Sequence, residues 1–458
     1  MSRKLFGTDG VRGVAGEFLT AELALALGRA ATRRTRAKRP QVLIVRDTRQ
    51  SGEMLQAALA AGVSSAGGDA LLGGILPTPA APLLIGRYGF DLAAVLSASH
   101  NLYRDNGIKF FAADGYKLSD EDELAIEHDL EHGRLLSGGE SSNGISDAPH
   151  GPSADTPPAI GHVRELRGAP EDYLRELHTR FAALDLSGQH VVLDCANGAT
   201  YQVAPEIFRR LGAEVTVLAD TPDGRNINAD CGSTHIQGLA DRVVSGAHEI
   251  GFAFDGDGDR MLAVDDRGEV VDGDELMALA TLHLRDSGRL EGNGVAVTVM
   301  TNYGFHAAMQ REGVSVATTQ VGDRYVLEEL RARGWTLGGE QSGHIIEMGF
   351  NRTGDGIAAA LLTLEALAGR RLSERDAMRK LPQRLVNVAV RDRGALGEAQ
   401  EVEAAVSGAE RDLAGRGRVL VRPSGTEQLV RVMVEAPTEQ EAQEVCERLV
   451  ALVERELG

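Results

Sequence analysis

The chain has little of several features that mark secreted or membrane-spanning proteins. Its 458 residues contain only three cysteines, Cys195, Cys231 and Cys446, and their spacing matches no metal site. So few cysteines fit a reducing compartment rather than a disulfide-stabilised fold. The start, M-S-R-K-L-F-G, lacks an apolar signal segment, and the longest uncharged run, residues 70–86, is short and broken by three prolines. We therefore expect a cytoplasmic protein with no membrane contact.

Positive charge is also scarce. The chain has 48 Lys and Arg against 67 Asp and Glu, a net charge of −19. This balance argues against binding to nucleic acid or to an anionic membrane surface, so any anionic ligand must be held by a local group of cations. With 43% hydrophobic residues over this length, several separate cores can form, and we expect two to four domains.

Strand and helix patterns alternate along most of the chain, which predicts an α/β fold. Apolar runs of strand length at residues 41–47 and 91–96 alternate with helical periodicity in the first part. A Gly-, Ser- and Pro-rich stretch at residues 136–159 reads as a linker, a second alternating unit follows it, and a third begins at about Met261. From Leu381 the pattern changes to that of a small α+β domain. The predicted domain boundaries give four ranges: 1–158, 159–254, 255–370 and 371–458.

A hydroxyl lies just after one of these buried strands. The segment A-V-L-S-A-S-H-N at residues 94–101 ends an apolar run with Ser99, followed by His100 and Asn101. Open α/β sheets place their chemistry at the carboxyl ends of strands, so Ser99 is a candidate nucleophile or phosphoryl carrier. The alternative is an ordinary polar turn.

Two further segments could serve a phosphorylated Ser99. The glycine-rich segment F-G-T-D-G-V-R-G at residues 6–13 reads as a loop, and its Arg12 is a candidate phosphate contact. Lys109 lies in the short strand D-N-G-I-K-F-F, ten residues after Ser99, and could act in proton transfer or charge stabilisation. The alternatives are a flexible entry loop and a solvated lysine at a sheet edge.

The strongest chemical signal is F-D-G-D-G-D-R at residues 254–260. Asp255, Asp257 and Asp259 alternate with glycines, which lets the backbone bring three carboxylates to one point. Such a group indicates a hard divalent cation, and Mg²⁺ suits it. An EF-hand is excluded because position twelve of the loop is Asp266 rather than Glu. We expect the loop to be exposed, with Arg260 beside it as a phosphate clamp.

Two other loops carry mixed donors and acceptors. The turn G-G-E-Q-S-G-H presents Glu340, Ser342 and His344, a set suited to sugar hydroxyls. Before it, T-Q-V-G-D-R-Y-V opens a helix, where Gly322 to Arg324 could face an anion or Asp323 could simply cap the helix.

The C-terminal domain contains a group suited to a phosphate monoester, with two guanidinium groups, hydroxyls and free N–H groups near a turn. Its members are Arg422, Ser424, Gly425, Thr426 and Arg431. The alternative for this segment is a turn in which Ser and Thr occur by chance.

Taken together and in this order, these motifs resemble the α-D-phosphohexomutase superfamily, over the whole chain. The G-E-Q-S-G-H turn, called the sugar loop below, resembles a motif of the branch that interconverts glucosamine 6-phosphate and glucosamine 1-phosphate. The T-x-V-G-D-R-Y-V loop and the G-T-D-G-V-R-G start resemble motifs of the same branch. The resemblance implies an isomerase of four domains around a central cleft: a phosphoserine-bearing, a metal-loop, a sugar-binding and a C-terminal phosphate-binding domain. It leaves open whether the chain acts as a monomer or a homodimer.

The resemblance also implies the chemistry. Ser99 would be the phosphoserine, and one Mg²⁺ per chain would be bound by the Ser99 phosphate with Asp255, Asp257 and Asp259. The reaction would pass through glucosamine 1,6-bisphosphate and supply amino-sugar and peptidoglycan precursors. The catalytic set it implies is Ser99, His100, Lys109, Arg12 and Arg260. Two alternatives stay open: a sister mutase for mannose or glucose phosphates, and a non-catalytic protein that binds sugar phosphates.

The chain departs from the superfamily pattern at two positions. Leu102 stands where a proline usually follows S-H-N, and Gln428 stands where a proline usually follows S-G-T-E. We expect both changes to loosen a loop without removing a reacting group.

Overall fold

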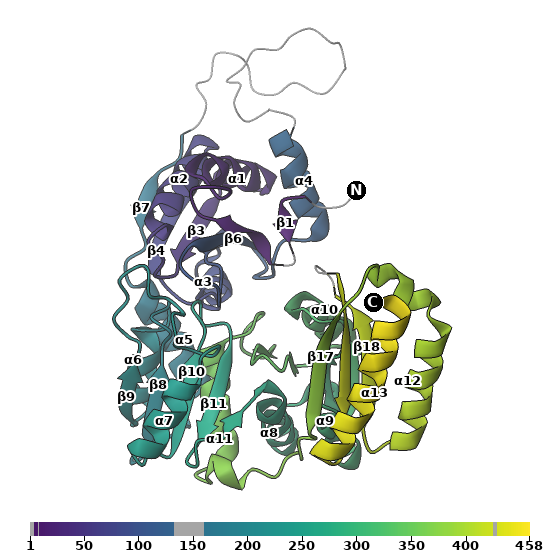
Figure 1. The fold of residues 1–458 in the computed structure, drawn as a ribbon. Helices are drawn as coiled ribbons and strands as arrows, with labels where there is room; N and C mark the ends of the chain where they lie inside the picture. Colours follow the sequence, from purple (N-terminus) through teal and green to yellow (C-terminus); the bar gives the residue numbers. More distant parts are fainter. Residues whose placement is uncertain (1–3, 8, 132–159, 425–427) are drawn as a thin grey trace. The chain divides into compact units, whose positions relative to one another are not determined.

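The computed structural model describes residues 4–7, 9–131, 160–424 and 428–458 (Figure 1). The chain divides into two units, the first comprising residues 1–298 and 318–374 and the second residues 299–317 and 375–458. The predicted linker at residues 136–159 lies outside the described residues, as do Gly425 and Thr426.

The first unit begins with a seven-stranded sheet in the order β1-β2-β6-β5-β3-β4-β7. The strands are β1 (Phe6–Gly7), β2 (Gly10–Val14), β3 (Gln41–Arg46), β4 (Asp69–Ile75), β5 (Leu92–Leu96), β6 (Asp105–Ala112) and β7 (Val163–Glu165). The helices are α1 (Ala21–Arg34), α2 (Gly52–Ser65), α3 (Ala80–Tyr88) and α4 (Asp120–Glu131). Leucine, valine and alanine side chains of α1, α2, β3 and β5 share one buried core, as the alternating pattern predicts.

The segment expected to be a glycine-rich entry loop is a hairpin instead. β2 pairs antiparallel with β6, with Val11 opposite Ile108, so the loop prediction for this stretch is wrong. Val11 is fully buried, and Gly10 has a φ of 80° where a Cβ would come within 2.4 Å of the Ile108 carbonyl oxygen. The glycines therefore allow two strands to approach closely rather than leaving the segment free.

The second sheet has the order β12-β11-β10-β8-β9. Its strands are β8 (His190–Asp194), β9 (Glu214–Leu218), β10 (Ile250–Phe254), β11 (Met261–Asp265) and β12 (Val270–Val271), with helices α5 (Ala169–Arg180), α6 (Val203–Arg210) and α7 (Gln237–Ser245). β11 pairs antiparallel with β10, so Met261 continues this sheet and the third alternating pattern begins only after Val271. The three-aspartate segment thus lies in the turn between two paired strands.

The third sheet has the order β14-β13-β15-β16. Its strands are β13 (Gly294–Thr298), β14 (Ser315–Thr319), β15 (Leu337–Gly339) and β16 (Ile345–Glu347), and α8 (Gly273–Asp286), α10 (Asp323–Arg333) and α11 (Gly356–Leu367) complete this region. The sugar-loop motif joins β15 to β16.

The described part of the second unit contains a three-stranded antiparallel sheet, in the order β17-β19-β18, with α-helices beside it. The elements are α9 (Tyr303–Arg311), β17 (Gln383–Ala389), α12 (Gln400–Leu413), β18 (Arg418–Pro423), β19 (Leu429–Glu435) and α13 (Glu439–Leu457). Figure 1 shows α12 and α13 on one face of this sheet. Alternate valines of β19 and an apolar stripe of α13 form its core, as expected for an α+β domain.

No helix in the described ranges combines the length and the apolar character needed to cross a bilayer.

The half-buried His306 on α9 allows a prediction about pH dependence. Burial and the nearby Arg418 guanidinium lower the pKa of His306 from its ordinary 6.5 to about 4. The unfolded chain therefore takes up this proton first, so His306 contributes stability above pH 6.5 that is lost as the pH falls through about 4. In histidine-selective NMR, with the signal assigned from the His306→Gln variant, we expect a titration midpoint near pH 4. A midpoint near 6.5 would contradict this packing.

Candidate active site

Ser99 lies in the loop that joins β5 to β6 and is 1% exposed. Its φ is 52°, in the left-handed region that residues other than glycine rarely adopt. Its Oγ donates a hydrogen bond of 2.5 Å to Asp255 Oδ2, on the turn between β10 and β11. The loop between β5 and β6 of the seven-stranded sheet therefore holds Ser99 against Asp255. The contacts around Ser99 must stabilise its left-handed backbone conformation.

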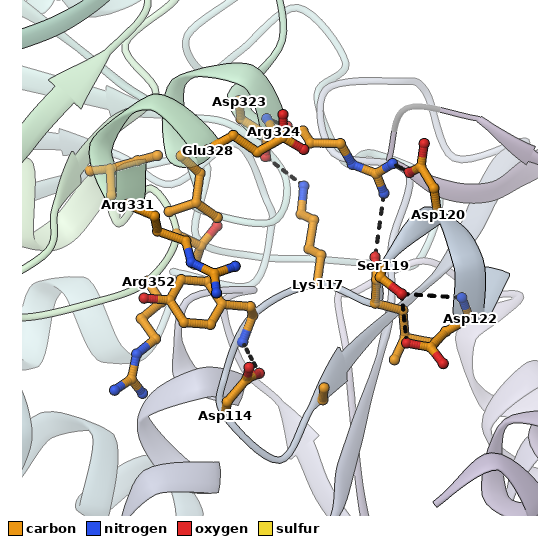
Figure 2. A pocket seen from close by; sticks show the side chains of 16 residues that line it. Asp114, Lys117, Ser119, Asp120, Asp122, Asp323, Arg324, Glu328, Arg331 and Arg352 are labelled. Carbon is orange, nitrogen blue, oxygen red and sulfur yellow. Dashed lines mark hydrogen bonds and ion pairs between the residues drawn. The ribbon is translucent and has the colours of Figure 1, made fainter. Parts of the chain in front are cut away.

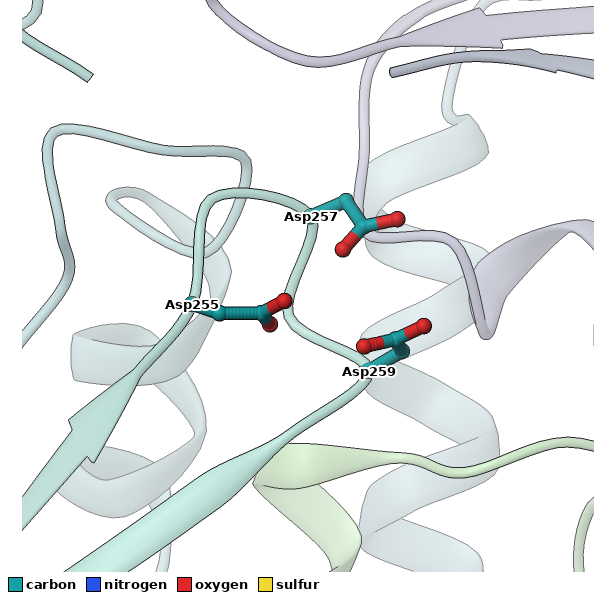
Figure 3. Close-up of side chains that lie close together, drawn as sticks. All are labelled: Asp255, Asp257 and Asp259. Atoms are coloured by element: carbon teal, nitrogen blue, oxygen red, sulfur yellow. The ribbon is translucent and has the colours of Figure 1, made fainter. Parts of the chain in front are cut away.

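The three carboxylates of the metal motif converge. Figure 3 shows Asp255, Asp257 and Asp259 pointing toward one another, and one oxygen of each lies within 4.8 Å of the others. Asp255 and Asp257 are fully buried and Asp259 is 5% exposed, so the expectation of an exposed loop is wrong. The neighbouring glycines explain the burial, because a Cβ on Gly256 would come within 2.6 Å of the Ser99 carbonyl oxygen.

The carboxylate group fits a divalent cation. Asp257 Oδ1 and Asp259 Oδ1 are buried and accept no hydrogen bond from any described residue. Burial and the charges of Asp259 and Asp257 raise the pKa of Asp255 well above its usual range. Mg²⁺ binds carboxylate oxygens such as these. A cation here would satisfy the oxygens that accept no hydrogen bond and would reduce the repulsion between the three carboxylates.

Lys109 is the principal cation of this group. Its side chain is 1% exposed on β6, an interior strand, so the alternative of a solvated edge lysine is wrong. Its Nζ lies 2.8 Å from Asp257, 2.9 Å from Asp9 and 3.8 Å from Asp259. Burial alone would lower the pKa of Lys109, but these carboxylates raise it well above its ordinary value. A permanently charged ammonium suits charge stabilisation better than proton transfer.

The other cations and His100 surround Ser99. His100 Nδ1 lies 3.4 Å from Ser99 Oγ and 3.4 Å from an Arg260 nitrogen. Burial and the charges of Arg260 and Arg12 lower the pKa of His100, which keeps the imidazole neutral at neutral pH. Arg260 Nε lies 3.8 Å from Asp259, and Arg12 pairs with Asp9. The geometry brings together all five residues that the resemblance implies as catalytic.

Sequence reasoning missed a second set of charges beside this group. Lys117 pairs with Asp9 at 2.5 Å and also with Asp323 at the start of α10, and Figure 2 shows it reaching toward Asp323. His344 lies 3.7 Å from both Asp323 and Asp259. Together these groups form a ring of neighbouring side chains in which acidic and basic residues alternate: Asp9, Lys109, Asp259, His344, Asp323 and Lys117.

The loop before α10 is used within the protein. The Gly322 N–H donates 2.9 Å to Glu340 Oε1, Asp323 pairs with Lys117, and Arg324 pairs with Asp120 and Glu123. The N-cap residue of α10 is Gly322, and no side chain caps this helix, so the Asp323 cap is not found. The anion site at this loop stays a prediction.

A cavity of about 570 Å³ adjoins this loop (Figure 2). Its lining comes from residues 112–122, 323–331 and 346–353 and includes Lys117, Asp323 and Arg324. Neither Ser99 nor the three aspartates of the metal motif line it. The volume is in the range of small-molecule sites, although the cavity lies apart from Ser99.

The sugar-loop residues differ in exposure. Glu340 is 8% exposed and is held by Gly322, while Ser342 is exposed. His344 is 2% exposed and accepts a hydrogen bond from the Gly354 N–H at Nε2, so its proton lies on Nδ1, facing Asp259. Ser342 is therefore open to solvent, Glu340 is buried against Gly322, and His344 joins the sugar loop to the metal motif.

The group predicted to bind a phosphate monoester, from Arg422 to Arg431, belongs to the second unit and is called the phosphate cup below. Arg422 of β18 and Arg431 of β19 stand directly opposite each other, and Nε of each is buried with no hydrogen bond to a described residue. Burial and the neighbouring Arg431 lower the pKa of Arg422. Ser424 is 3% exposed, and its N–H donates to the Leu429 carbonyl. Two facing guanidinium groups with unused donors favour an anionic ligand.

The structure also places both departures from the superfamily pattern. The Leu102 side chain is 55% exposed, and its carbonyl accepts a hydrogen bond from Arg49. Gln428 is exposed, its carbonyl accepts from the Val390 N–H at 3.1 Å, and its side chain accepts from the Arg393 N–H at 3.3 Å. Both positions have backbone contacts that limit their freedom.

The carboxylate group predicts a measurable effect on metal binding. Asp257→Asn removes one of three converging charges, so we expect the Mg²⁺ affinity measured by titration calorimetry to fall by about 10-fold to 100-fold. Asp241→Asn changes an exposed aspartate of α7 and serves as the matched control. Equal affinities for Asp257→Asn and the parent protein would show that this group holds no cation.

Four family models match the chain, one for each domain of the phosphoglucomutase/phosphomannomutase architecture. The alpha/beta/alpha domains I, II and III match residues 3–136, 171–268 and 272–385, and the C-terminal domain matches residues 385–452. The solved structure of a phosphoglucomutase/phosphomannomutase family protein from Burkholderia thailandensis has a TM-score of 0.81 at 23% identity, covering 98% of this chain and 97% of its own. The N-acetylphosphoglucosamine mutase of Aspergillus fumigatus, in complex with GlcNAc-6P and magnesium, has a TM-score of 0.66 at 17% identity, with coverages of 99% and 96%. These structures share the fold.

Curated relatives are much closer in sequence. The phosphoglucosamine mutase of Moorella thermoacetica is 50% identical over 447 residues, which are 96% of this chain and 97% of that protein. The phosphoglucosamine mutase of Heliobacterium modesticaldum is 48% identical over 462 residues, with 99% of each chain covered. The predicted superfamily and the four-domain α/β class are confirmed, and the chain belongs to the phosphoglucosamine mutase family.

Proposed function

We propose that this enzyme interconverts glucosamine 6-phosphate and glucosamine 1-phosphate through a phosphorylated Ser99. The observation that carries the proposal is the position of Ser99 Oγ, 2.5 Å from one of three converging carboxylates and within reach of a neutral histidine. A serine in this setting can carry a phosphoryl group. The relatives that cover the whole chain are named for the same reaction.

In the first half-reaction, the sugar hydroxyl at carbon 1 or carbon 6 attacks the Ser99 phosphate. The bond from phosphorus to Oγ breaks, a bond from phosphorus to the sugar oxygen forms, and the product is glucosamine 1,6-bisphosphate. The hydroxyl proton is lost to a base, and Oγ regains a proton. His100 is suited to this exchange because its imidazole is neutral and lies 3.4 Å from Oγ.

The carboxylates and cations share the charge. Asp255, Asp257 and Asp259 would hold one Mg²⁺ together with the Ser99 phosphate, and the bound ion would offset phosphate charge. Lys109 stays cationic between Asp257 and Asp9 and faces the same point. Arg12 and Arg260 supply further positive charge around the phosphate and the three carboxylates, as phosphoryl transfer requires.

The bisphosphate must then turn end for end and return its other phosphate to Ser99. Arg422, Ser424, Gly425, Thr426 and Arg431 would hold whichever phosphate is not reacting. The unused guanidinium donors of Arg422 and Arg431 support this role. Glu340, Ser342 and His344 form the sugar loop. Of these, Glu340 and Ser342 would contact ring hydroxyls that both orientations of the sugar present.

We place the enzyme in the cytoplasm, where its product would supply amino-sugar nucleotides and peptidoglycan precursors.

Substrate preference tests the proposed function. A protonated amine at carbon 2 gains from nearby carboxylates in an acidic protein, whereas mannose presents an axial hydroxyl there that needs a differently shaped pocket. We expect kcat/KM to be highest for glucosamine 6-phosphate and weaker but measurable for glucose 6-phosphate, because one polar contact is worth only about 1–3 kcal/mol. Mannose 6-phosphate ranking first would move the chain to the sister mutases.

Ser99→Ala is the control for the reaction itself. The variant should lose nearly all turnover on every sugar while still binding sugar phosphate, since the carrier oxygen is gone and the cup remains. Turnover near that of the parent enzyme would remove the phosphoserine from the mechanism.

A further inference from the structure

A buried arginine lies directly behind the Ser99 loop. Arg49 follows β3 in the segment R-D-T-R at residues 46–49, and its side chain is 0% exposed. It does not contact Ser99 Oγ; its partners are backbone carbonyls of the loop and the carboxylate of Asp47. A buried guanidinium is costly unless its donors are satisfied, so its position here has a structural or functional purpose.

All five N–H donors of Arg49 are used. Nε donates 2.8 Å to Asp47 Oδ2. One terminal nitrogen donates 2.9 Å to the Ser99 carbonyl and 2.7 Å to the Asn101 carbonyl. The other donates to the Leu102 carbonyl and, at 2.9 Å, to the Asp105 carbonyl. One side chain therefore fixes four carbonyls over seven residues, a pattern that only the planar fork of arginine can supply.

Two neighbours complete the hold on Ser99. Ser97 Oγ donates 2.5 Å to Asp47 and accepts the Ser99 N–H at 2.9 Å. Asn228, 2% exposed in the loop after β9, donates 2.8 Å to the Ser99 carbonyl and 2.9 Å to the Asn101 carbonyl. Both the N–H and the carbonyl of Ser99 are thus held by side chains, which accounts for its left-handed φ of 52°.

The same contacts set the distance between the serine and the carboxylates. A Cβ on Gly256, inside the metal motif, would come within 2.6 Å of both Asn228 Nδ2 and the Ser99 carbonyl oxygen. The turn that carries Asp255 and Asp257 therefore packs directly onto the network of Arg49 and Asn228. A shift of the Ser99 carbonyl would move Oγ relative to Asp255, which it now contacts at 2.5 Å.

We infer that Arg49, with its partner Asp47, and Asn228 are positioning residues for phosphoryl transfer: they act through the loop backbone to keep Ser99 Oγ aimed at the carboxylate group. This inference rests on the proposed function. It also explains how the loop keeps its shape with Leu102 in place of proline, since the Leu102 carbonyl is one of the four that Arg49 holds.

The test compares Arg49→Lys and Asn228→Ala with the parent enzyme. Arg49→Lys keeps the charge but loses the fork, and a misplacement of about 1 Å can cost about 100-fold in rate. We expect kcat per folded molecule to fall by roughly 100-fold for Arg49→Lys and by roughly 10-fold for Asn228→Ala, which removes two of the contacts. KM for glucosamine 6-phosphate should change by less than about 3-fold in both, because neither residue belongs to the sugar loop or the phosphate cup.

Arg46→Lys is the matched control, since Arg46 is a neighbouring, largely buried arginine whose partners are Glu53 and the Asp47 carbonyl. It should retain the parent kcat. The folded fraction of each variant is measured by circular dichroism, so that loss of protein is not counted as loss of rate. If Arg49→Lys does not fold, Asn228→Ala decides the question alone.

A second readout separates this inference from the choice of sugar. The rate at which Ser99 gains phosphate from glucose 1,6-bisphosphate is followed by intact mass. We expect the same slowing in the variants, even if glucosamine 6-phosphate proves not to be the preferred substrate. Parent-like kcat and parent-like phosphorylation of Ser99 in both folded variants would overturn the positioning role, as would a loss confined to KM.

Discussion

Three carboxylates are buried with one oxygen of each within 4.8 Å of the others, and the rest of the site must compensate for the free energy that this burial costs. Each would be expensive to desolvate alone, and together they repel, so the surroundings must supply positive charge and hydrogen-bond donors. Lys109 compensates several of these charges at once, with Nζ within 4 Å of Asp257, Asp259 and Asp9. What remains unsatisfied, one oxygen each of Asp257 and Asp259, is the part of the group left for a cation.

The arrangement of the strands places the compensating charges beside the three carboxylates. Lys109 stands on β6, which is paired on one side with the β2 hairpin and on the other with β5, the strand that delivers Ser99. The aspartates stand on the turn between β10 and β11, where glycines permit the close packing that larger residues would prevent. Asp9 and Lys117 then extend the alternation of charge to Asp323 and the sugar loop. The Ser99 loop, the metal motif and the sugar loop are therefore linked by one electrostatic network.

Much of the site could be predicted from the sequence because its residues occur in compact motifs. Ser99 and the three aspartates follow buried strands, and the glycines that alternate with the aspartates predicted that the carboxylates converge. The hairpin of β1 and β2 could not be predicted from local pattern, because a glycine-rich segment reads as a loop until a partner strand is known. Burial of the metal motif was missed for the same reason, since it depends on contacts with Ser99 and Asn228 from distant segments. The boundaries at 158, 254 and 370 remain predictions.

Other residues were missed although the sequence held a signal for them. Asp47 and Arg49 follow the buried strand β3 as Ser99 follows β5, so the argument that singled out Ser99 applies equally to them. Asp9 lies three residues before Arg12, a spacing that allows the pair they form. Lys117 carried no such signal, and Asp323 was considered only as a helix cap or part of an anion site, because their pairing joins residues 206 positions apart.

The proposed mechanism requires that phosphate pass directly between Ser99 and the sugar. The most direct measurement is a single-turnover experiment with enzyme carrying ³²P on Ser99, mixed with glucosamine 6-phosphate and Mg²⁺ and quenched at short times. The label should leave the protein at least as fast as kcat and appear first in glucosamine 1,6-bisphosphate. Label that stays on the protein during turnover, or that is released only as inorganic phosphate, would rule out transfer through Ser99.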